Sequence, residues 1–155
     1  DRPRIAKREN ADLYISLHYN AVADSVNPYE QPRGFSVYYY HPHSLALGWQ
    51  IHQTYLKNIP LPDEGLRFGD YHVIRHNTQM PAVLVESAYM VMPEQAELIR
   101  TQAFQDRLAE SVADGVLNLF GLKRPPKKIK PAPAKLPAMK RPAKKPSTKK
   151  AAAKK

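Results

Sequence analysis

The 155-residue sequence contains no cysteine. This absence excludes disulfide bonds, thiolate metal sites and a cysteine nucleophile, and it leaves both reducing and oxidising compartments open. No apolar run approaches the roughly 18 residues of a membrane span, and no G-x-S-x-G motif of a serine hydrolase is present. The chain starts at Asp1 with neither a methionine nor an apolar leader. We therefore expect further residues upstream and infer nothing from the missing signal peptide.

Acidic residues are absent from the last part of the chain. Residues 123–155 hold 14 of the 24 lysines and arginines, seven prolines and no aspartate or glutamate. Residues 1–122 keep 10 basic and 14 acidic side chains, a net charge of −4, although the whole chain is formally +10. A segment so poor in large apolar groups cannot offset an ordering entropy of about 1–2 kcal/mol per residue. We expect one folded domain over residues 1–122 and a disordered basic tail over residues 123–155.

Strand-like and helix-like patterns alternate within the expected domain. Short runs rich in β-branched and aromatic residues predict strands at residues 13–18, 35–40, 71–75 and 82–87. Apolar spacing predicts helices at residues 45–59, 94–100 and 102–120. In the first helix Leu45, Trp49 and Leu56 recur at helical spacing after Ser44, a candidate N-cap, and Gly121 is placed to end the last. The order predicts an α/β fold, a mainly parallel twisted sheet flanked by helices. Antiparallel pairing of residues 35–40 at a sheet edge stays open.

Two residues that could take part in catalysis or metal binding lie at or near the ends of apolar strand segments. His18 ends the first predicted strand, and Glu86 lies near the end of the last. The carboxyl ends of parallel strands line the ligand crevice of α/β sheets, so a metal ligand and a catalytic carboxylate are expected there. A hydrogen-bonded structural histidine and a partly exposed carboxylate explain the same pattern. The residue types alone leave both interpretations open.

Two longer motifs resemble a known enzyme family. ADLYISLHYNA resembles ADLFISIHANA of the zinc-dependent N-acetylmuramoyl-L-alanine amidases, whose histidine binds zinc. MPAVLVESAYMVMPEQAELI resembles PAVLVETGFLSNPEEAELL, whose glutamate is catalytic. RIAKRENADL, GFSVYYY, PDEGLR and YHVIR also resemble family segments in the same order, so the similarity covers nearly all of residues 4–120. The resemblance implies that His18 is a zinc ligand and that Glu86 is the catalytic residue.

The resemblance also implies an activity and a location. The family hydrolyses the amide between the lactyl group of N-acetylmuramic acid and L-alanine, with zinc-activated water and the glutamate as general base. We therefore expect Zn²⁺ as cofactor, peptidoglycan as substrate, and a periplasmic or secreted protein of a bacterial cell envelope. The basic tail is expected to bind anionic envelope polymers, because positive charge on an extended chain attracts polyanions. Nucleic acid is disfavoured as a partner, because the domain shows no basic stripe. The alternative is an inactive amidase-like scaffold whose tail binds an anionic polymer or nucleic acid.

The chain also departs from the family pattern. The family's other zinc ligands, a histidine in D-x-G-H-G-G and a glutamate on the next helix, lie upstream of Asp1. One ligand remains where a catalytic zinc needs three, so we expect these residues alone to be inactive. Ala88, Val91 and Met92 replace a glycine and a Ser-Asn pair, which affects substrate fit more than chemistry. The helix over residues 45–59 runs almost directly into PDEGLR, which leaves no room for the autoinhibitory insertion of division amidases and predicts an uncovered site.

Other histidines have simpler explanations. His41 and His43 flank a proline, and an exposed turn is favoured over a shared metal. His52 is expected at the surface or boundary of its helix. A substrate contact from His76 is a minor alternative, and His72, four residues earlier, carries no assigned role.

Overall fold

A computed structural model describes residues 2–124 as a four-stranded sheet with helices on both faces. The sheet order is β1 (Tyr14–Asn20), β4 (Ala82–Tyr89), β2 (Phe35–Tyr39) and β3 (Asp63–Phe68). β1 runs parallel to β4 and β2 parallel to β3, whereas β2 and β4 are antiparallel. The α/β prediction is confirmed. The disorder expected for the tail lies, from residue 125 on, outside the described residues.

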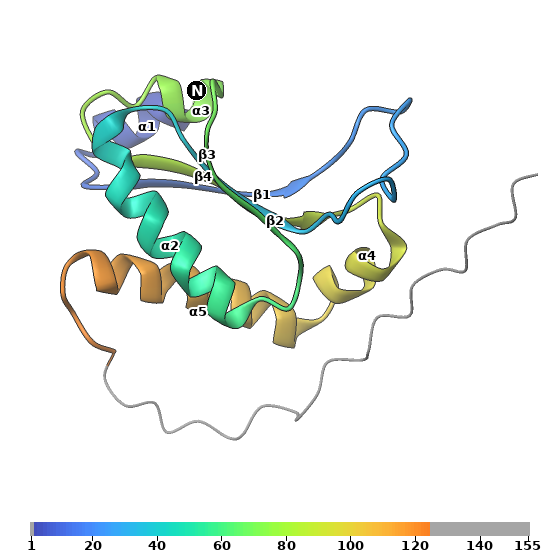
Figure 1. Ribbon diagram of the computed structural model, residues 1–155. Coiled ribbons are helices and arrows are strands. Elements are labelled where there is room, and N and C mark those ends of the chain that lie inside the picture. Colours follow the sequence, from blue (N-terminus) through green and yellow to red (C-terminus); the bar gives the residue numbers. More distant parts are fainter. Residues whose placement is uncertain (1, 125–155) are drawn as a thin grey trace, which may run out of the picture.

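The helices form two groups around the sheet (Figure 1). They are α1 (Arg2–Arg8), α2 (Leu45–Asn58), α3 (His72–Arg75), α4 (Pro93–Ile99) and α5 (Gln102–Leu119), with a 3-10 turn at Pro42–Ser44. The long helices α2 and α5 pack together under one face of the sheet, and the short α1 and α3 lie toward the other. None of the helices in residues 2–124 is long and apolar enough to cross a membrane.

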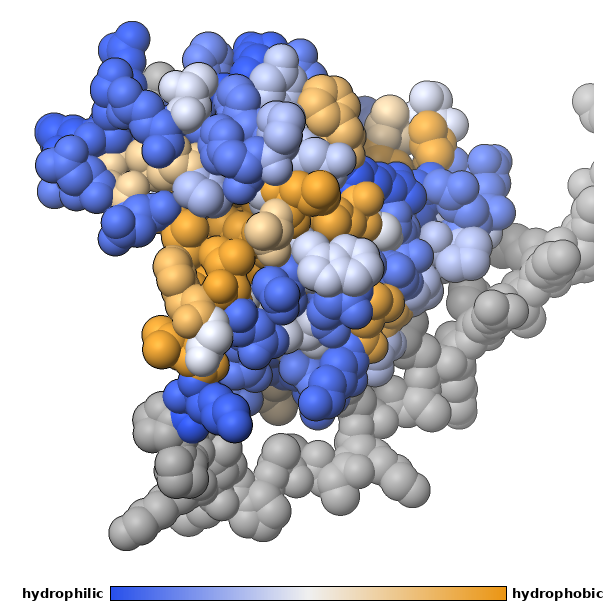
Figure 2. All heavy atoms as spheres, turned by 60° about the vertical axis from the view of Figure 1, so that its left-hand side comes forward, coloured by the Kyte–Doolittle hydropathy of each residue, from blue (hydrophilic) through white to orange (hydrophobic). Residues whose placement is uncertain are grey.

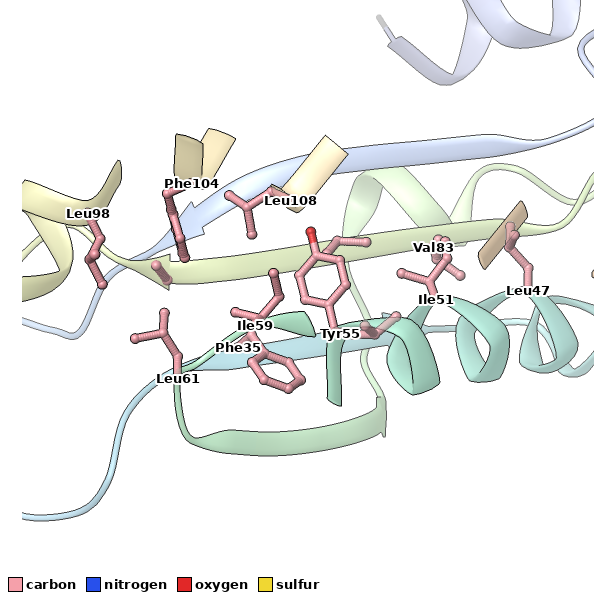
Figure 3. Close-up of a cluster of buried hydrophobic side chains, with 13 residues drawn as sticks. Phe35, Leu47, Ile51, Tyr55, Ile59, Leu61, Val83, Leu98, Phe104 and Leu108 are labelled. Carbon is pink, nitrogen blue, oxygen red and sulfur yellow. The ribbon is translucent and has the colours of Figure 1, made fainter. Parts of the chain in front are cut away.

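Alternation along β4 assigns each side chain to one face of the sheet. Val83 enters the main core with Ile51 and Tyr55 of α2 (Figure 3), and Val85 belongs to the same cluster. Ala82 and Leu84, by contrast, enter a second cluster around Ile74 of α3. Successive strand residues point to opposite faces. The Glu86 side chain is therefore on the α3 face, two residues beyond Leu84.

A close helix contact closes the main core. A Cβ atom added to Gly115 of α5 would lie 2.7 Å from the Cα of Ile51 on α2. The Thr54 hydroxyl of α2 donates to the carbonyl oxygen of Ser111 at 2.7 Å, which joins the same two helices. α5 ends where predicted. Gly121 follows it with a backbone φ of 65°, which residues other than glycine rarely adopt. The backbone of α2 can approach α5 this closely because position 115 has no side chain.

Two strand predictions require correction. Residues 72–75 form a helical turn, α3, and not a strand, because the turn buries Ile74 completely against the sheet while Asp70 pairs with Arg75 at 2.7 Å. β3 was not predicted, since Pro60 and Pro62 precede it and Gly65 interrupts its apolar pattern. β2 does pair antiparallel, yet it lies inside the sheet between β4 and β3, not at an edge.

α2 turns a different face to the core than its largest apolar residues suggest. Leu45, Trp49 and Leu56 are exposed, and the helix instead buries a stripe that includes Leu47 and Ile51. That stripe also contains Gly48, and a Cβ there would lie 2.9 Å from a methyl group of Leu66. The face with the smallest residue therefore packs closest to the sheet.

Two polar residues of this region have roles that the sequence did not indicate. Ser44 occupies the N-cap position of α2 but makes no cap hydrogen bond; its hydroxyl accepts from the amide of Ala82 at 2.9 Å. His52 is buried, contrary to prediction, and its Nε2 lies 2.8 Å from a carboxylate oxygen of Asp63. Both contacts join α2 to the sheet.

Candidate active site

The strand register brings His18 and Glu86 together. His18 is the Cα partner of Glu86 in the parallel pair β1 and β4, and Ser36 is its partner in the antiparallel pair β2 and β4. Directly opposite residues project to the same face of a sheet, with Cβ atoms about 4.5–5.5 Å apart in antiparallel pairs. His18, Glu86 and Ser36 thus form one row across three strands, on the α3 face.

Glu86 is the buried acidic group of this row. Its exposure is 9%, and within residues 2–124 its Oε2 is buried without a hydrogen-bond partner. Desolvation by burial raises the pKa of Glu86 above its ordinary value. A carboxylate that has lost water without gaining hydrogen bonds is a stronger base than an exposed one. The environment therefore suits proton abstraction.

No pattern in the sequence indicated Ser36 as a site residue. Its exposure is 1%, and its hydroxyl is also buried without a hydrogen-bond partner among the described residues. A serine between Phe35 and Val37 gives no local indication of a role. Only the non-local register between β2 and β4 places it beside Glu86.

Two tyrosines border the row. Tyr38 lies two residues beyond Ser36 on β2, and its ring packs edge-on against Tyr71 with centroids 4.9 Å apart. Burial and a hydrogen bond with Tyr38 raise the pKa of Tyr71 to about 12, with smaller contributions from Tyr38 and Glu86 charges. The Tyr71 phenol therefore stays protonated at neutral pH. It adds a neutral polar group beside the row.

The loop after β4 is held by a polar cluster. The Tyr89 hydroxyl donates to Glu64 at 3.2 Å, and the Glu64 carboxylate lies 3.7 Å from the Arg33 guanidinium. Gln95 of α4 accepts from the Tyr89 amide at 2.8 Å and donates to the Arg33 carbonyl at 2.8 Å. Of the positions that depart from the family motif, Ala88 and Met92 are buried and Val91 is exposed. Val91 is therefore the departure that changes the surface.

The metal-ligand set is incomplete within the described residues. His18 is half-buried beside Glu86, but no three histidine, aspartate or glutamate side chains in residues 2–124 are arranged to hold a metal ion. His41 and His43 each place Nε2 near a backbone carbonyl oxygen, of Arg75 at 2.8 Å and of Met80 at 3.2 Å. These contacts favour the structural interpretation of both rings. Within residues 2–124, the row of His18, Glu86 and Ser36 therefore contains no complete set of metal ligands.

Two hollows adjoin the sheet. One, of about 280 Å³, is lined by His18 and Ser87 together with residues that include Tyr55 of α2 and Leu108 of α5. The other is lined by Leu13, Phe120 and neighbouring residues, at the end of the molecule where Figure 2 shows hydrophobic side chains gathered on the surface. Glu86 lines neither hollow.

Comparison with known proteins gives a consistent result. A family model described as N-acetylmuramoyl-L-alanine amidase matches residues 1–118. The chain is 32% identical to the endolysin of Bacillus phage SPP1, over 87% of this chain and 52% of that protein. It is also 32% identical to the probable cell wall amidase LytH of Staphylococcus aureus, over 70% of this chain and 35% of LytH. The chain therefore spans about half the length of these curated relatives or less.

A solved structure is similar as well. The catalytic domain of CwlV, an N-acetylmuramoyl-L-alanine amidase from Bacillus (Paenibacillus) polymyxa, superimposes with a TM-score of 0.68 at 31% identity. The match covers 77% of this chain and 64% of the CwlV chain. The described fold is thus shared with part of that domain.

Proposed function

Because this chain belongs to the N-acetylmuramoyl-L-alanine amidase family, we propose that the protein hydrolyses the amide between N-acetylmuramic acid and L-alanine in peptidoglycan. The observation that carries the proposal is the pairing of His18 with Glu86 near the carboxyl ends of β1 and β4. The family motifs assign to these two residues the roles of zinc ligand and catalytic glutamate. The fold brings them to adjacent positions on one face of the sheet.

Glu86 supplies the acid and base chemistry in this proposal. Its desolvated carboxylate takes a proton from the attacking water, and the water oxygen forms a bond to the lactyl carbonyl carbon. The same carboxyl then returns the proton to the alanine nitrogen as the amide bond breaks. The products are a free lactyl carboxylate and a peptide with a new amino terminus. No serine or cysteine nucleophile is needed.

Zinc dependence is part of the proposal, with His18 as one ligand. When bound, the ion would lower the pKa of water toward about 7 and polarise the substrate carbonyl. Residues 2–124 supply a single histidine at this position, so two further ligands are required. The unpartnered Glu86 oxygen beside His18 supports a polar ligand at this point.

We also propose an extracytoplasmic, cell-wall-associated role, periplasmic or secreted. The cell wall relative LytH supports the coarse location, and the proposed substrate requires it. The 14 lysines and arginines of residues 123–155 are proposed to attract anionic envelope polymers, because extended positive charge binds polyanions without a folded pocket.

A second candidate function is a catalytically inactive amidase-like scaffold that binds polyanions through its basic tail. A full-length protein without the family's other histidine and glutamate ligands would favour this scaffold over an enzyme. The buried Glu86 carboxyl favours the enzyme, because a scaffold has no use for a desolvated acid without hydrogen bonds.

The test is hydrolysis of purified peptidoglycan by the full-length protein. We expect new L-alanine amino termini to appear, to vanish with a zinc chelator, and to return when zinc is restored. Hydrolysis that survives chelation refutes the zinc part of the proposal. The absence of new amino termini with zinc present refutes the amidase activity and supports the scaffold.

A further inference from the structure

We propose that Ser36 is a positioning residue, whose hydroxyl holds the Glu86 carboxylate in its working orientation. The inference rests on the proposed amide hydrolysis and extends it to a third strand of the site. It starts from two buried polar atoms, Ser36 Oγ and Glu86 Oε2, that both lack hydrogen-bond partners among the described residues. The two residues are Cα partners across β2 and β4.

An unpartnered buried hydroxyl destabilises a fold. The residues on either side of Ser36, Phe35 and Val37, are fully apolar and buried in the main core. An alanine at position 36 would fit the same backbone without a polar group to satisfy. A buried hydroxyl at this position therefore calls for a partner that the working site supplies.

The chemistry of the two groups is complementary. A serine hydroxyl donates one hydrogen bond, and an ionised carboxylate only accepts. Opposite positions in an antiparallel pair leave the Cβ atoms about 4.5–5.5 Å apart, so side-chain rotation or one bridging water joins hydroxyl and carboxylate. Such a bond fixes which oxygen of Glu86 faces the row and which faces the attacking water.

The other hydroxyl groups near Glu86 already have hydrogen-bond partners. Ser87 follows Glu86 in sequence but points to the opposite face, where its hydroxyl lies 3.1 Å from that of buried Tyr55. Tyr71 hydrogen-bonds with Tyr38. Ser36 is the group directly across from Glu86 on β2, and this assigns the positioning role to it.

The test uses three substitutions in the full-length protein, with a soluble muropeptide as substrate. Ser36→Ala should lower kcat about 10-fold or more, the ratio expected for losing a hydrogen bond to a charged group, while KM changes less than about twofold. Ser36→Cys keeps the volume with a weak donor and should resemble Ser36→Ala. Ser36→Thr keeps the hydroxyl and should restore most of kcat.

Thermal unfolding separates positioning from packing. The melting temperature of Ser36→Ala should stay close to that of the wild type, because the loss of the bond to Glu86 is offset by removal of a buried hydroxyl. Ser87→Ala is the matched control, since it removes a hydroxyl one residue from Glu86 that does have a partner. It should lower the melting temperature and leave kcat unchanged.

The outcomes are distinguishable. A Ser36→Ala variant with wild-type kcat overturns the inference and leaves the amidase proposal standing. A joint fall of kcat and melting temperature in Ser36→Ala, with no rescue by threonine, makes Ser36 a packing residue and also overturns it. A wild-type protein that cleaves no muropeptide refutes the amidase proposal, and the role of Ser36 falls with it.

Discussion

At the scale of single residues, His18 and Glu86 share one row but have separable roles. Glu86→Gln keeps the shape of the side chain and cannot accept a proton from water. We expect turnover by the full-length protein to fall by about 10²–10⁴-fold, the usual contribution of a general base, with zinc content unchanged. Activity on muropeptides and metal analysis of the purified variant measure the two effects.

His18→Ala should instead lose zinc, because it removes a ligand. His43→Ala serves as the control histidine, since its ring contacts the Met80 carbonyl and lies outside the row. It should retain both zinc and activity. Equal zinc loss in Glu86→Gln and His18→Ala would contradict the division of roles.

At the scale of elements, the contact between α2 and α5 depends on a glycine. Gly115→Ala places a Cβ 2.7 Å from the backbone of Ile51. Alanine gains about 1 kcal/mol in helix propensity, but overpacking costs about 1–3 kcal/mol, and the obstacle here is backbone that cannot rotate away. We expect a net loss of unfolding free energy, measured by denaturant titration.

Ala113→Gly tests the propensity term alone. Ala113 is exposed on the same helix, so its replacement by glycine should lower the unfolding free energy by about 0.5–1 kcal/mol. If Gly115→Ala raises the unfolding free energy, the helices do not approach as closely as described.

The end of the folded domain is also an element-scale question. Arg124 pairs with Asp114 of α5 at 2.5 Å and donates to the Glu110 carbonyl at 2.6 Å. We propose that the domain includes Arg124, two residues beyond the boundary that the composition suggests. Removing residues 123–155 should lower the unfolding free energy by up to about 1 kcal/mol, because the pair is only partly buried, whereas removing residues 125–155 should not. Equal stability of the two truncations would return the boundary to residue 122.

At the scale of the whole molecule, the charge asymmetry predicts a division of labour. Residues 125–155 carry 12 lysines and arginines and no acid. Deleting them should weaken cosedimentation with isolated cell envelopes at low salt, and the difference should shrink at high salt as screening increases. Cleavage of a small soluble muropeptide should stay unchanged. Salt-insensitive envelope binding, or loss of soluble cleavage, would contradict the anchoring role.

Local patterns sufficed for much of this protein. The apolar runs of β1, β2 and β4 and the spacing of α5 are properties of neighbouring residues, and the structure confirms each of them. The motifs around His18 and Glu86 likewise identify the family without coordinates. The roles of His18 as metal ligand and of Glu86 as catalytic residue stay predictions.

Tertiary structure decided what depends on distant partners. The segment around Ile74 became a helical turn because burial against β4 outweighs the strand preference of its β-branched residues. α2 buried Ile51 and left Trp49 exposed, because close approach to α5 is possible only where Gly115 faces it. Ser36 joined the row for the same kind of reason: strand register is set by pairing between segments far apart in sequence, and no local pattern encodes it.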